Sequence, residues 1–427
     1  MKRINFPEAS EWPALLARPL QNANSLFDTV RPILEAVKTQ GDESLRAFSL
    51  RFDGVALENL AVSDEEFEEC EQLIQDDLKQ AINLAKGTIT AFHAAQDQPL
   101  PVITTIKGVT CWQKALPIER VGLYIPGGSA PLFSTVLMLA IPAKLAGCGE
   151  IVLCTPSGKN GKVHPAVLYA AKVAGVRQVY KVGGAQAIAA MAYGTETIPK
   201  VYKIFGPGNQ YVTAAKQWVS LHDVAIDMPA GPSEVEVLAD ESANPVFVAA
   251  DLLSQAEHGV DSQAILITTS ASLADKVADE VERQLATLSR KDIASKSLEN
   301  SRLIVVKSLE EAIKATNEYA PEHLILAVEK PEVLAERVTN AGSVFLGHLT
   351  PESAGDYASG TNHTLPTNGY AKAYSGVNLD SFRKRITYQS ISPEGLRTIG
   401  SAIETMAEAE SLNAHKQAVT LRLKTLE

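Results

Sequence analysis

Cysteine is scarce in this sequence, and long apolar runs are missing. The 427 residues include only Cys70, Cys111, Cys148 and Cys154, and no two of them form a C-x-x-C pair. So few cysteines exclude a disulfide framework and favour a reducing compartment, so we expect a cytoplasmic protein. The longest apolar run, residues 136–143, is far shorter than the roughly 20 residues that a membrane span needs. The first residues lack the apolar core of a secretory signal, so we expect none.

Basic residues are fewer than acidic ones. Lys and Arg number 39 against 50 Asp and Glu, which gives a formal net charge of −11. Such a chain repels phosphate backbones, so we expect no nucleic-acid partner. Apolar residues at 45% and charged residues at 21% are ordinary globular values. The length is enough for about two to four domains, and collagen-like, disordered and membrane classes are excluded.

Strand and helix patterns alternate along most of the chain. After a polar lead-in, residues 26–97 carry apolar side chains at spacings of three and four, typical of helices. Ser63 and Glu66 have the spacing of a capping box, which marks a helix start. From residue 118 onward, short apolar runs end in Gly-rich turns followed by helical segments. Such units predict parallel strands with right-handed crossovers.

Two series of these units follow each other, with a boundary near Gly231 and Pro232. We therefore predict an α/β fold of two Rossmann-like, doubly wound parallel-sheet domains with a helical N-terminal segment and a C-terminal tail. The second series is expected to contain strands at 234–240, 263–269, 301–307, 323–328 and 343–347, separated by helices at 245–257, 272–288, 309–319 and 331–340. The tail, residues 377–427, is predicted to be mostly helical after Pro393.

No standard phosphate-binding fingerprint is present. Gly206-x-Gly208 lacks the third glycine of G-x-G-x-x-G, and Pro156 stands where a Walker A loop begins with glycine. Three Gly-rich turns remain, at residues 126–129, 183–186 and 206–209. Each follows a predicted strand, where open α/β sheets bind ligands and helix N-termini favour a pyrophosphate. Each is equally compatible with an ordinary turn, and the spacing does not identify a ligand.

Polar side chains suited to chemistry are concentrated in the second series. Gln255 and His258 share one face of a helix end, but glutamine is an unusual metal ligand. From spacing alone, a hydrogen bond at the helix terminus explains Gln255 better, and an interaction with the helix dipole explains His258. Glu322 and His323 stand at a strand start and suit proton transfer near neutral pH. A bare Glu-His dipeptide is more often a salt-bridged surface pair.

A loop and the tail supply the other candidates. Residues 351–366 contain almost no core-forming side chains and are expected to form a long irregular loop, which is usually functional or disordered. Within it, Asp356 and His363 are candidate ligands or acid/base groups. His415 lies near Glu410 in the helical tail, where a lone histidine is more often structural.

Seven motifs, taken together and in this order, resemble the histidinol dehydrogenase family over nearly the whole chain. They are VGLYIPGGSAPLFSTVLM, VGGAQAIAAMAYGT, FGPGNQYV, IDMPAGPSE, DLLSQAEHG, APEHL and SAGDYASGTNHTLPT. The resemblance implies oxidation of L-histidinol through L-histidinal to L-histidine, the last two steps of histidine biosynthesis. It further implies two NAD per reaction, one zinc ion per subunit, and a homodimer of intertwined subunits that share their active sites.

The resemblance also assigns roles to residues of this sequence. It implies Glu322 and His323 as the catalytic pair. Its zinc ligands are Gln255, His258, Asp356 and His415, the last contributed across the dimer. The implied substrate contacts are Ser233, Gln255, His258, His323, Asp356, His363, Glu410 and His415. The implied NAD contacts are Tyr124, Gln186 and Asn209.

Domain boundaries follow from the same resemblance. We expect an N-terminal segment at 1–25 and a first Rossmann-like domain from 26–118 plus 234–376, which carries most zinc and catalytic residues. The second, NAD-binding Rossmann-like domain is expected at 119–233, and a tail exchanged between subunits at 377–427.

Two other functions are compatible with much of this pattern. A related zinc and NAD dehydrogenase with another alcohol substrate would lack the residues that recognise the imidazole and amino groups of histidinol. His363 and Glu410, which match such residues, are present. A non-catalytic zinc- or nucleotide-binding protein would be expected to lose Glu322 or His323, and both are present. The pattern therefore favours L-histidinol oxidation.

Overall fold

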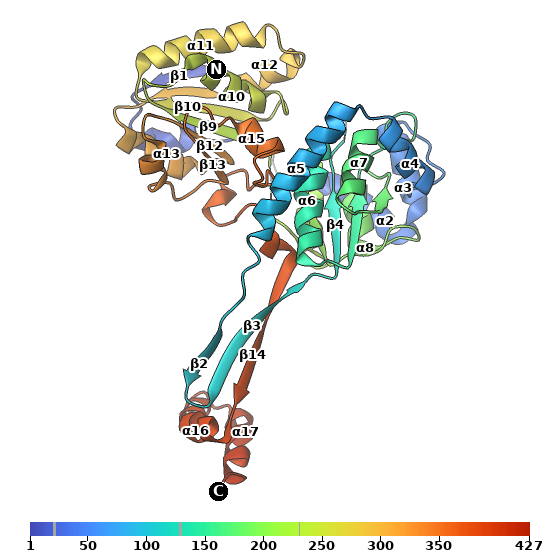
Figure 1. Ribbon diagram of the computed structural model, residues 1–427, viewed down its shortest axis with the longest axis vertical. Helices are drawn as coiled ribbons and strands as arrows, with labels where there is room; N and C mark the ends of the chain where they lie inside the picture. The colour runs from blue at the N-terminus through green and yellow to red at the C-terminus, as the bar shows by residue number, and fades with distance from the viewer. Residues whose placement is uncertain (20–22, 128–129, 230) are drawn as a thin grey trace. The chain divides into compact units, whose positions relative to one another are not determined.

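The chain divides into two units in the computed structural model, which describes residues 1–19, 23–127, 130–229 and 231–427. The first unit comprises Met1–Ala95 and Ile118–Phe382, and the second comprises Gln96–Pro117 and Arg383–Glu427. Gly128 and Ser129 of the first predicted Gly-rich turn lie outside the described residues. The first unit contains two parallel sheets, and the second contains an antiparallel sheet and two helices (Figure 1).

The first parallel sheet has five strands in the order β6-β5-β4-β7-β8. Its strands are β4 (Arg120–Tyr124), β5 (Glu150–Cys154), β6 (Gln178–Tyr180), β7 (Lys203–Phe205) and β8 (Ala225–Ile226). The chain runs outward from β4 to β6, then returns to the other side of β4 for β7. This reversal is the doubly wound arrangement of a Rossmann-like fold.

Helices cover both faces of the five-stranded sheet. One face is packed by α4 (Asp64–Gln72), α5 (Asp76–Ala94), α6 (Phe133–Ala146) and α7 (Pro165–Val173). The other is packed by α2 (Ala23–Gln40), α3 (Asp42–Phe48), α8 (Gly184–Tyr193) and α9 (Gln210–Ser220). The predicted capping box is confirmed, since Ser63 and Glu66 cap α4 reciprocally.

The position of the N-terminal helices differs from the expected domain boundaries. We expected residues 26–118 to form one domain with residues 234–376. Instead, their helices pack against helices of the five-stranded sheet: α2 contacts α8 and α9, α4 contacts α7, and α5 contacts α6. The apolar faces of these helices are thus buried in the cores of the five-stranded sheet. Helical periodicity marks which face is buried but does not say which sheet buries it.

The second parallel sheet has six strands in the order β1-β11-β10-β9-β12-β13. Its strands are β1 (Lys2–Asn5), β9 (Glu234–Ala239), β10 (Gln263–Thr268), β11 (Arg302–Val305), β12 (His323–Ala327) and β13 (Ser343–Leu346). Apart from β1, the order repeats that of the five-stranded sheet, so the predicted pair of Rossmann-like folds is confirmed. The polar lead-in was not expected to supply a strand, yet β1 pairs with β11.

Helices also cover both faces of the six-stranded sheet. One core includes α10 (Pro245–Ala256), α11 (Ala271–Leu285) and α12 (Lys291–Glu299). The other includes α13 (Leu309–Tyr319), α14 (Pro331–Ala335) and the segment around α1 (Trp12–Leu15). Helix α14 is shorter than the expected 331–340. The predicted irregular loop at 351–366 contains a short helix, α15 (Glu352–Tyr357), so that prediction is wrong in part.

The second unit is built on strands that the sequence reading did not anticipate. They are β2 (Val102–Ile106), β3 (Val109–Pro117) and β14 (Arg383–Ile391), paired antiparallel in the order β14-β3-β2. Side chains of β2 and most of β14 are exposed, so no buried face marked them as strands. The predicted helices after Pro393 are confirmed as α16 (Pro393–Ala409) and α17 (Asn413–Lys424).

Short helical turns complete the fold. They are η1 (Ala9–Glu11), η2 (Ser49–Asp53), η3 (Tyr370–Lys372) and η4 (Leu379–Phe382). All four cysteines are free, as the sequence predicts. Within the described ranges, no helix has the length and apolar character that crossing a bilayer requires.

Candidate active site

Polar side chains gather at the amino ends of two adjacent strands of the six-stranded sheet. Glu234 begins β9 and His323 begins β12, and these parallel strands are paired. Helix α10 runs back from the far end of β9, so Gln255 in its last turn and His258 just after its end return to the same edge. Open α/β sheets usually bind ligands at the carboxyl ends of strands. This cluster lies at the opposite edge.

Glu322 and His323 form a buried pair, 6% and 4% exposed. The Glu234 amide donates a hydrogen bond of 2.8 Å to Oε2 of Glu322. Nδ1 of His323 lies 3.1 Å from the carbonyl oxygen of Glu234. A carbonyl only accepts, so Nδ1 carries a proton in this contact, while Nε2 lies 3.6 Å from Oδ1 of Asp356. Nδ1 also lies 3.5 Å from Oε2 of Glu322, but the pair is buried, so the expectation of a surface pair is wrong.

The surroundings of the pair shift both pKa values. Burial lowers the pKa of His323, but the charges of Glu322 and Glu352 and a hydrogen bond with Asp356 together raise it well above its usual value. Burial raises the pKa of Glu322, against the attraction of His323. Perturbed acid and base groups in contact are typical of proton-transfer sites.

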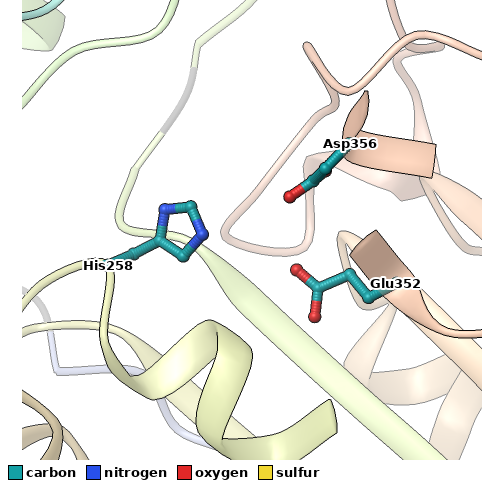
Figure 2. A group of neighbouring side chains, drawn as sticks. All are labelled: His258, Glu352 and Asp356. Atoms are coloured by element: carbon teal, nitrogen blue, oxygen red, sulfur yellow. The ribbon is translucent and has the colours of Figure 1, made fainter. Parts of the chain in front are cut away.

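Three potential ligand side chains point toward one another beside this pair (Figure 2). His258, Glu352 and Asp356 each offer a ligand atom, and these atoms lie within 4.8 Å of one another. Burial would raise the pKa of Asp356, but contacts with His323, His363 and His258 hold it below its usual value. Asp356 is therefore a carboxylate, which is the form that binds a cation.

Gln255 lies next to this group with its carbonyl oxygen unused. The side chain is 1% exposed, and its Nε2 lies 3.4 Å from Oε2 of Glu322. Among the described residues, its Oε1 has no hydrogen-bond partner. A buried amide oxygen without a partner is rare and is suited to a cation. The structure thus removes the objection that spacing alone raised against Gln255 as a ligand.

Glu352 was missed by the sequence reading. Its Oε2 accepts a hydrogen bond of 3.1 Å from Ser254, while its Oε1 is buried without a partner in the described part of the chain. Burial raises its pKa to about 8, and the neighbouring carboxylates Asp356 and Glu322 add to the effect. Glu352 and Asp356 are four residues apart in α15, a spacing that places both on one helix face. The sequence analysis expected an irregular loop at 351–366, so this helical spacing of Glu352 and Asp356 was not recognised.

The expected substrate contacts divide between the two units. His363 joins the cluster, with Nδ1 3.0 Å from the carbonyl oxygen of Asp356 and Nε2 3.1 Å from Oγ1 of Thr135. Ser233 directly precedes β9, and its carbonyl oxygen accepts from the Gln263 amide. Glu410 and His415 are exposed on the second unit, at the end of α16 and on α17.

A cavity of about 1070 Å³ opens at the carboxyl ends of the five-stranded sheet. Tyr124, Gln186 and Asn209 all line it, so the structure brings the three expected NAD contacts together. The side-chain Oδ1 of Asn209 caps α9 by accepting from the backbone amides of Tyr211 and Val212. Its side-chain Nδ2 is therefore the group that can meet a ligand. Behind Tyr124, Gly206 has φ +126°, and a Cβ there would overlap the carbonyl oxygen of Tyr124. Strand order reverses between β4 and β7, where such sheets bind nucleotides.

Comparison with known proteins assigns the family. The sequence profile described as histidinol dehydrogenase matches residues 16–423. The chain belongs to the histidinol dehydrogenase family. It is accordingly an oxidoreductase of the dehydrogenase type, and the resemblance carried by the motifs is confirmed.

Relatives match along their whole length. The chain is 67% identical to a histidinol dehydrogenase of Bacteroides thetaiotaomicron over 426 residues, covering 100% of both chains. It is 54% identical to that of Escherichia coli K12, covering 99% of this chain and 97% of that one. The crystal structure of histidinol dehydrogenase from Elizabethkingia anophelis superposes with a TM-score of 0.97 at 56% identity, covering 100% of this chain and 98% of that one.

Proposed function

We propose that this protein oxidises L-histidinol through L-histidinal to L-histidine, using two NAD⁺ and one zinc ion per subunit. These are the last two steps of histidine biosynthesis. The observation that carries the proposal is the buried Glu322–His323 pair beside a group of nitrogen and oxygen ligands, in a member of the histidinol dehydrogenase family. We further propose that it works in the cytoplasm, where its free thiols stay reduced.

The ligand group fits a divalent metal. Buried polar atoms normally have partners, yet Gln255 Oε1, Glu352 Oε1 and His323 Nε2 have none among the described residues. A mixed set of imidazole, carboxylate and amide donors without thiolate is acceptable for zinc. We assign Gln255, His258 and Asp356 as ligands, with His415 of the partner subunit as the fourth. When bound, zinc supplies a charged template that orients the imidazole and amino groups of the substrate.

The cofactor site is the cavity of the five-stranded sheet. We assign Tyr124, Gln186 and Asn209, which line it, as NAD contacts. This keeps the proposal that residues 119–233 form the NAD-binding domain. NAD⁺ supplies the hydride acceptor, and the protein supplies position and proton transfer.

Two residues move the protons. In the zinc-loaded site, the metal charge would offset the carboxylates that raise the pKa of His323, and His323 would accept the alcohol proton at Nε2, the ring nitrogen not engaged by Glu234. Glu322 takes a proton from the water that adds to the aldehyde. His323 releases the first proton to solvent and then serves as base again for the second oxidation. Ser233, His363 and Glu410 hold the substrate, and retention of the aldehyde keeps a reactive intermediate from solvent.

The second unit supports a homodimer with exchanged tails. Apolar side chains are exposed on its strands and helices, among them Val102, Ile103, Ile391, Met406 and Leu421. Exposed apolar groups gathered on a small unit indicate a surface covered by another chain. We propose that residues 377–427 pack against the partner subunit and complete its active site, which makes the two sites shared.

NADH formation with L-histidinol tests the reaction and the metal together. Two NADH per histidinol, lost on chelation and restored by Zn²⁺, is the expected result. The matched control is chelator followed by Mg²⁺, which should not restore the rate because Mg²⁺ prefers oxygen ligands and retains its waters. If zinc-loaded protein forms no NADH, the substrate assignment is wrong, and other amino alcohols or polyols become the substrates to test.

A further inference from the structure

One residue outside the catalytic pair holds both of its members. Glu234 donates its backbone N–H to Oε2 of Glu322 at 2.8 Å, and its carbonyl oxygen lies 3.1 Å from Nδ1 of His323. A small shift of Glu234 would therefore move both members of the pair together. The orientation of the His323 ring also depends on this carbonyl, because it accepts from Nδ1.

The side chain of Glu234 is itself clamped. Arg18 donates from Nε to Oε1 at 2.5 Å and from Nη2 to Oε2 at 2.8 Å, the two-pronged geometry that suits guanidinium and carboxylate. The amide of Asn368 donates to Oε1 at 2.6 Å. The two charged side chains are only 13% and 3% exposed, so solvent does little to weaken the pair.

Arg18 is held in turn by the end of helix α13. Its Nη2 donates to the carbonyl oxygen of Tyr319 at 2.7 Å, and its guanidinium lies 4.1 Å from the centre of the Tyr319 ring. Trp12 and Leu16, just before it in the chain, are buried in the core on this face. The N-terminal segment is thus anchored, and Arg18 has a defined place from which to hold Glu234.

The positive charge of Arg18 compensates the buried negative charge of Glu234. The carboxyl groups of Glu234, Glu236 and Glu322 are all buried near the start of β9. Removing the partner of a buried charge leaves that charge uncompensated and is strongly destabilising. Without Arg18, the side chain of Glu234 would be driven toward solvent, and its backbone would move with it.

We propose that Arg18 and Glu234 are positioning residues of the active site. Their ion pair fixes the backbone of Glu234, which holds the His323 ring through Nδ1 and the Glu322 carboxyl through Oε2. Neither side chain takes part in the chemistry. The inference rests on the proposed role of His323 as the base, and it assigns a catalytic consequence to a segment far from the site in sequence.

Chemical rescue of Arg18→Ala tests the inference. In the zinc-loaded enzyme, we expect kcat to fall roughly 10- to 100-fold, the cost of misplacing a catalytic group by about 1 Å or losing a supporting partner. The KM values for L-histidinol and NAD⁺ and the zinc content should stay near those of the wild type. Millimolar guanidinium should restore part of kcat, because it can occupy the vacated space and pair with Glu234. Sodium chloride at equal ionic strength should not.

A second arginine with the same kind of ion pair serves as the control. It tests whether losing any such pair is enough to lower kcat. Arg337 makes the same two-pronged contact with Glu310, but on the surface. Arg337→Ala should keep wild-type kcat and show no response to guanidinium. If Arg18→Ala keeps wild-type kcat, or loses activity without rescue by guanidinium, the positioning role is wrong. Should Arg18→Ala fail to fold, Arg18→Lys carries the test, since it keeps the charge but not the fork, and an unchanged kcat there overturns the proposal.

A readout without turnover separates this inference from the proposed reaction. Nitrogen-15 NMR of the histidine rings reports the hydrogen bond at each ring nitrogen, and the signal missing in His323→Ala identifies His323. We expect the signal of an Nδ1–H group hydrogen-bonded to Glu234 in the wild type and its displacement in Arg18→Ala. Absence of NADH from the wild type would contradict the proposed reaction. An unchanged Nδ1 signal in Arg18→Ala would contradict the positioning role, whatever the substrate.

Discussion

His323 contacts the backbone carbonyl of Glu234 through Nδ1 at 3.1 Å, while its buried Nε2 makes no hydrogen bond among the described residues and lies 3.6 Å from Oδ1 of Asp356. One ring nitrogen is therefore committed to the backbone, and the other faces the group of potential ligands. That division suits a general base whose orientation is set before the substrate binds. It also explains how a histidine at the start of a buried strand can have a catalytic role and not only pack in the core.

His323→Ala should remove most of the turnover and leave the metal in place. General base catalysis contributes roughly 10²- to 10⁴-fold, so a loss of that size in kcat is expected. Zinc content, measured by elemental analysis, should match the wild type because His323 is not an assigned ligand. Normal turnover in this variant would refute the assignment of the base.

Heterodimers of one His323→Ala chain and one His415→Ala chain should recover activity. Each parent homodimer lacks one group in both sites, and His415→Ala should also bind zinc more weakly. If each site takes His415 of the partner subunit, one site of the heterodimer contains both defects and the other contains neither. An isolated heterodimer should then have half of the wild-type kcat. A heterodimer as inactive as its parents would show that the sites are not shared.

Gly206→Ala should weaken NAD⁺ binding and lower stability. Its φ of +126° is unfavourable for any other residue, and the added methyl would overlap the backbone of Tyr124, which lines the cavity. The strain alone costs about 1–3 kcal/mol. Calorimetric titration with NAD⁺ and thermal unfolding measure the two effects. Gly175→Ala is the control, because φ there is +78° but the nearest atom is 3.5 Å away. Equal loss of NAD⁺ affinity in both variants would contradict this explanation.

Glu236→Gln should stabilise the protein more at pH 8 than at pH 5. Burial raises the pKa of Glu236 to about 8, although a hydrogen bond from Thr316 and the charge of Arg18 lower it. A carboxyl with a raised pKa binds its proton more tightly when folded, so its ionisation reduces stability as pH rises from the unfolded value toward 8. Glutamine removes that loss. The difference in Tm between variant and wild type should grow by a few degrees across this range, and a pH-independent difference would refute the assignment.

The sequence by itself determined the fold class and much of the site. Apolar runs, Gly-rich turns and helical periodicity predicted two parallel sheets because these patterns record which faces are buried. Motifs around Gln255, His258, Glu322, His323 and Asp356 identified the family, since they occur in one order along nearly the whole chain. The three expected NAD contacts followed from the same motifs, and these residues line one cavity in the structure.

Tertiary structure decided how these residues work. Spacing could not show that Glu322 and His323 are buried, or that the amide oxygen of Gln255 is unpartnered. Glu352 was hidden because its stretch had too few apolar side chains to indicate a helix. Arg18 lies 216 residues before Glu234 in the chain. Local periodicity reports only whether a position is buried, whereas partners so distant are set by strand order and by the helices that close over each face.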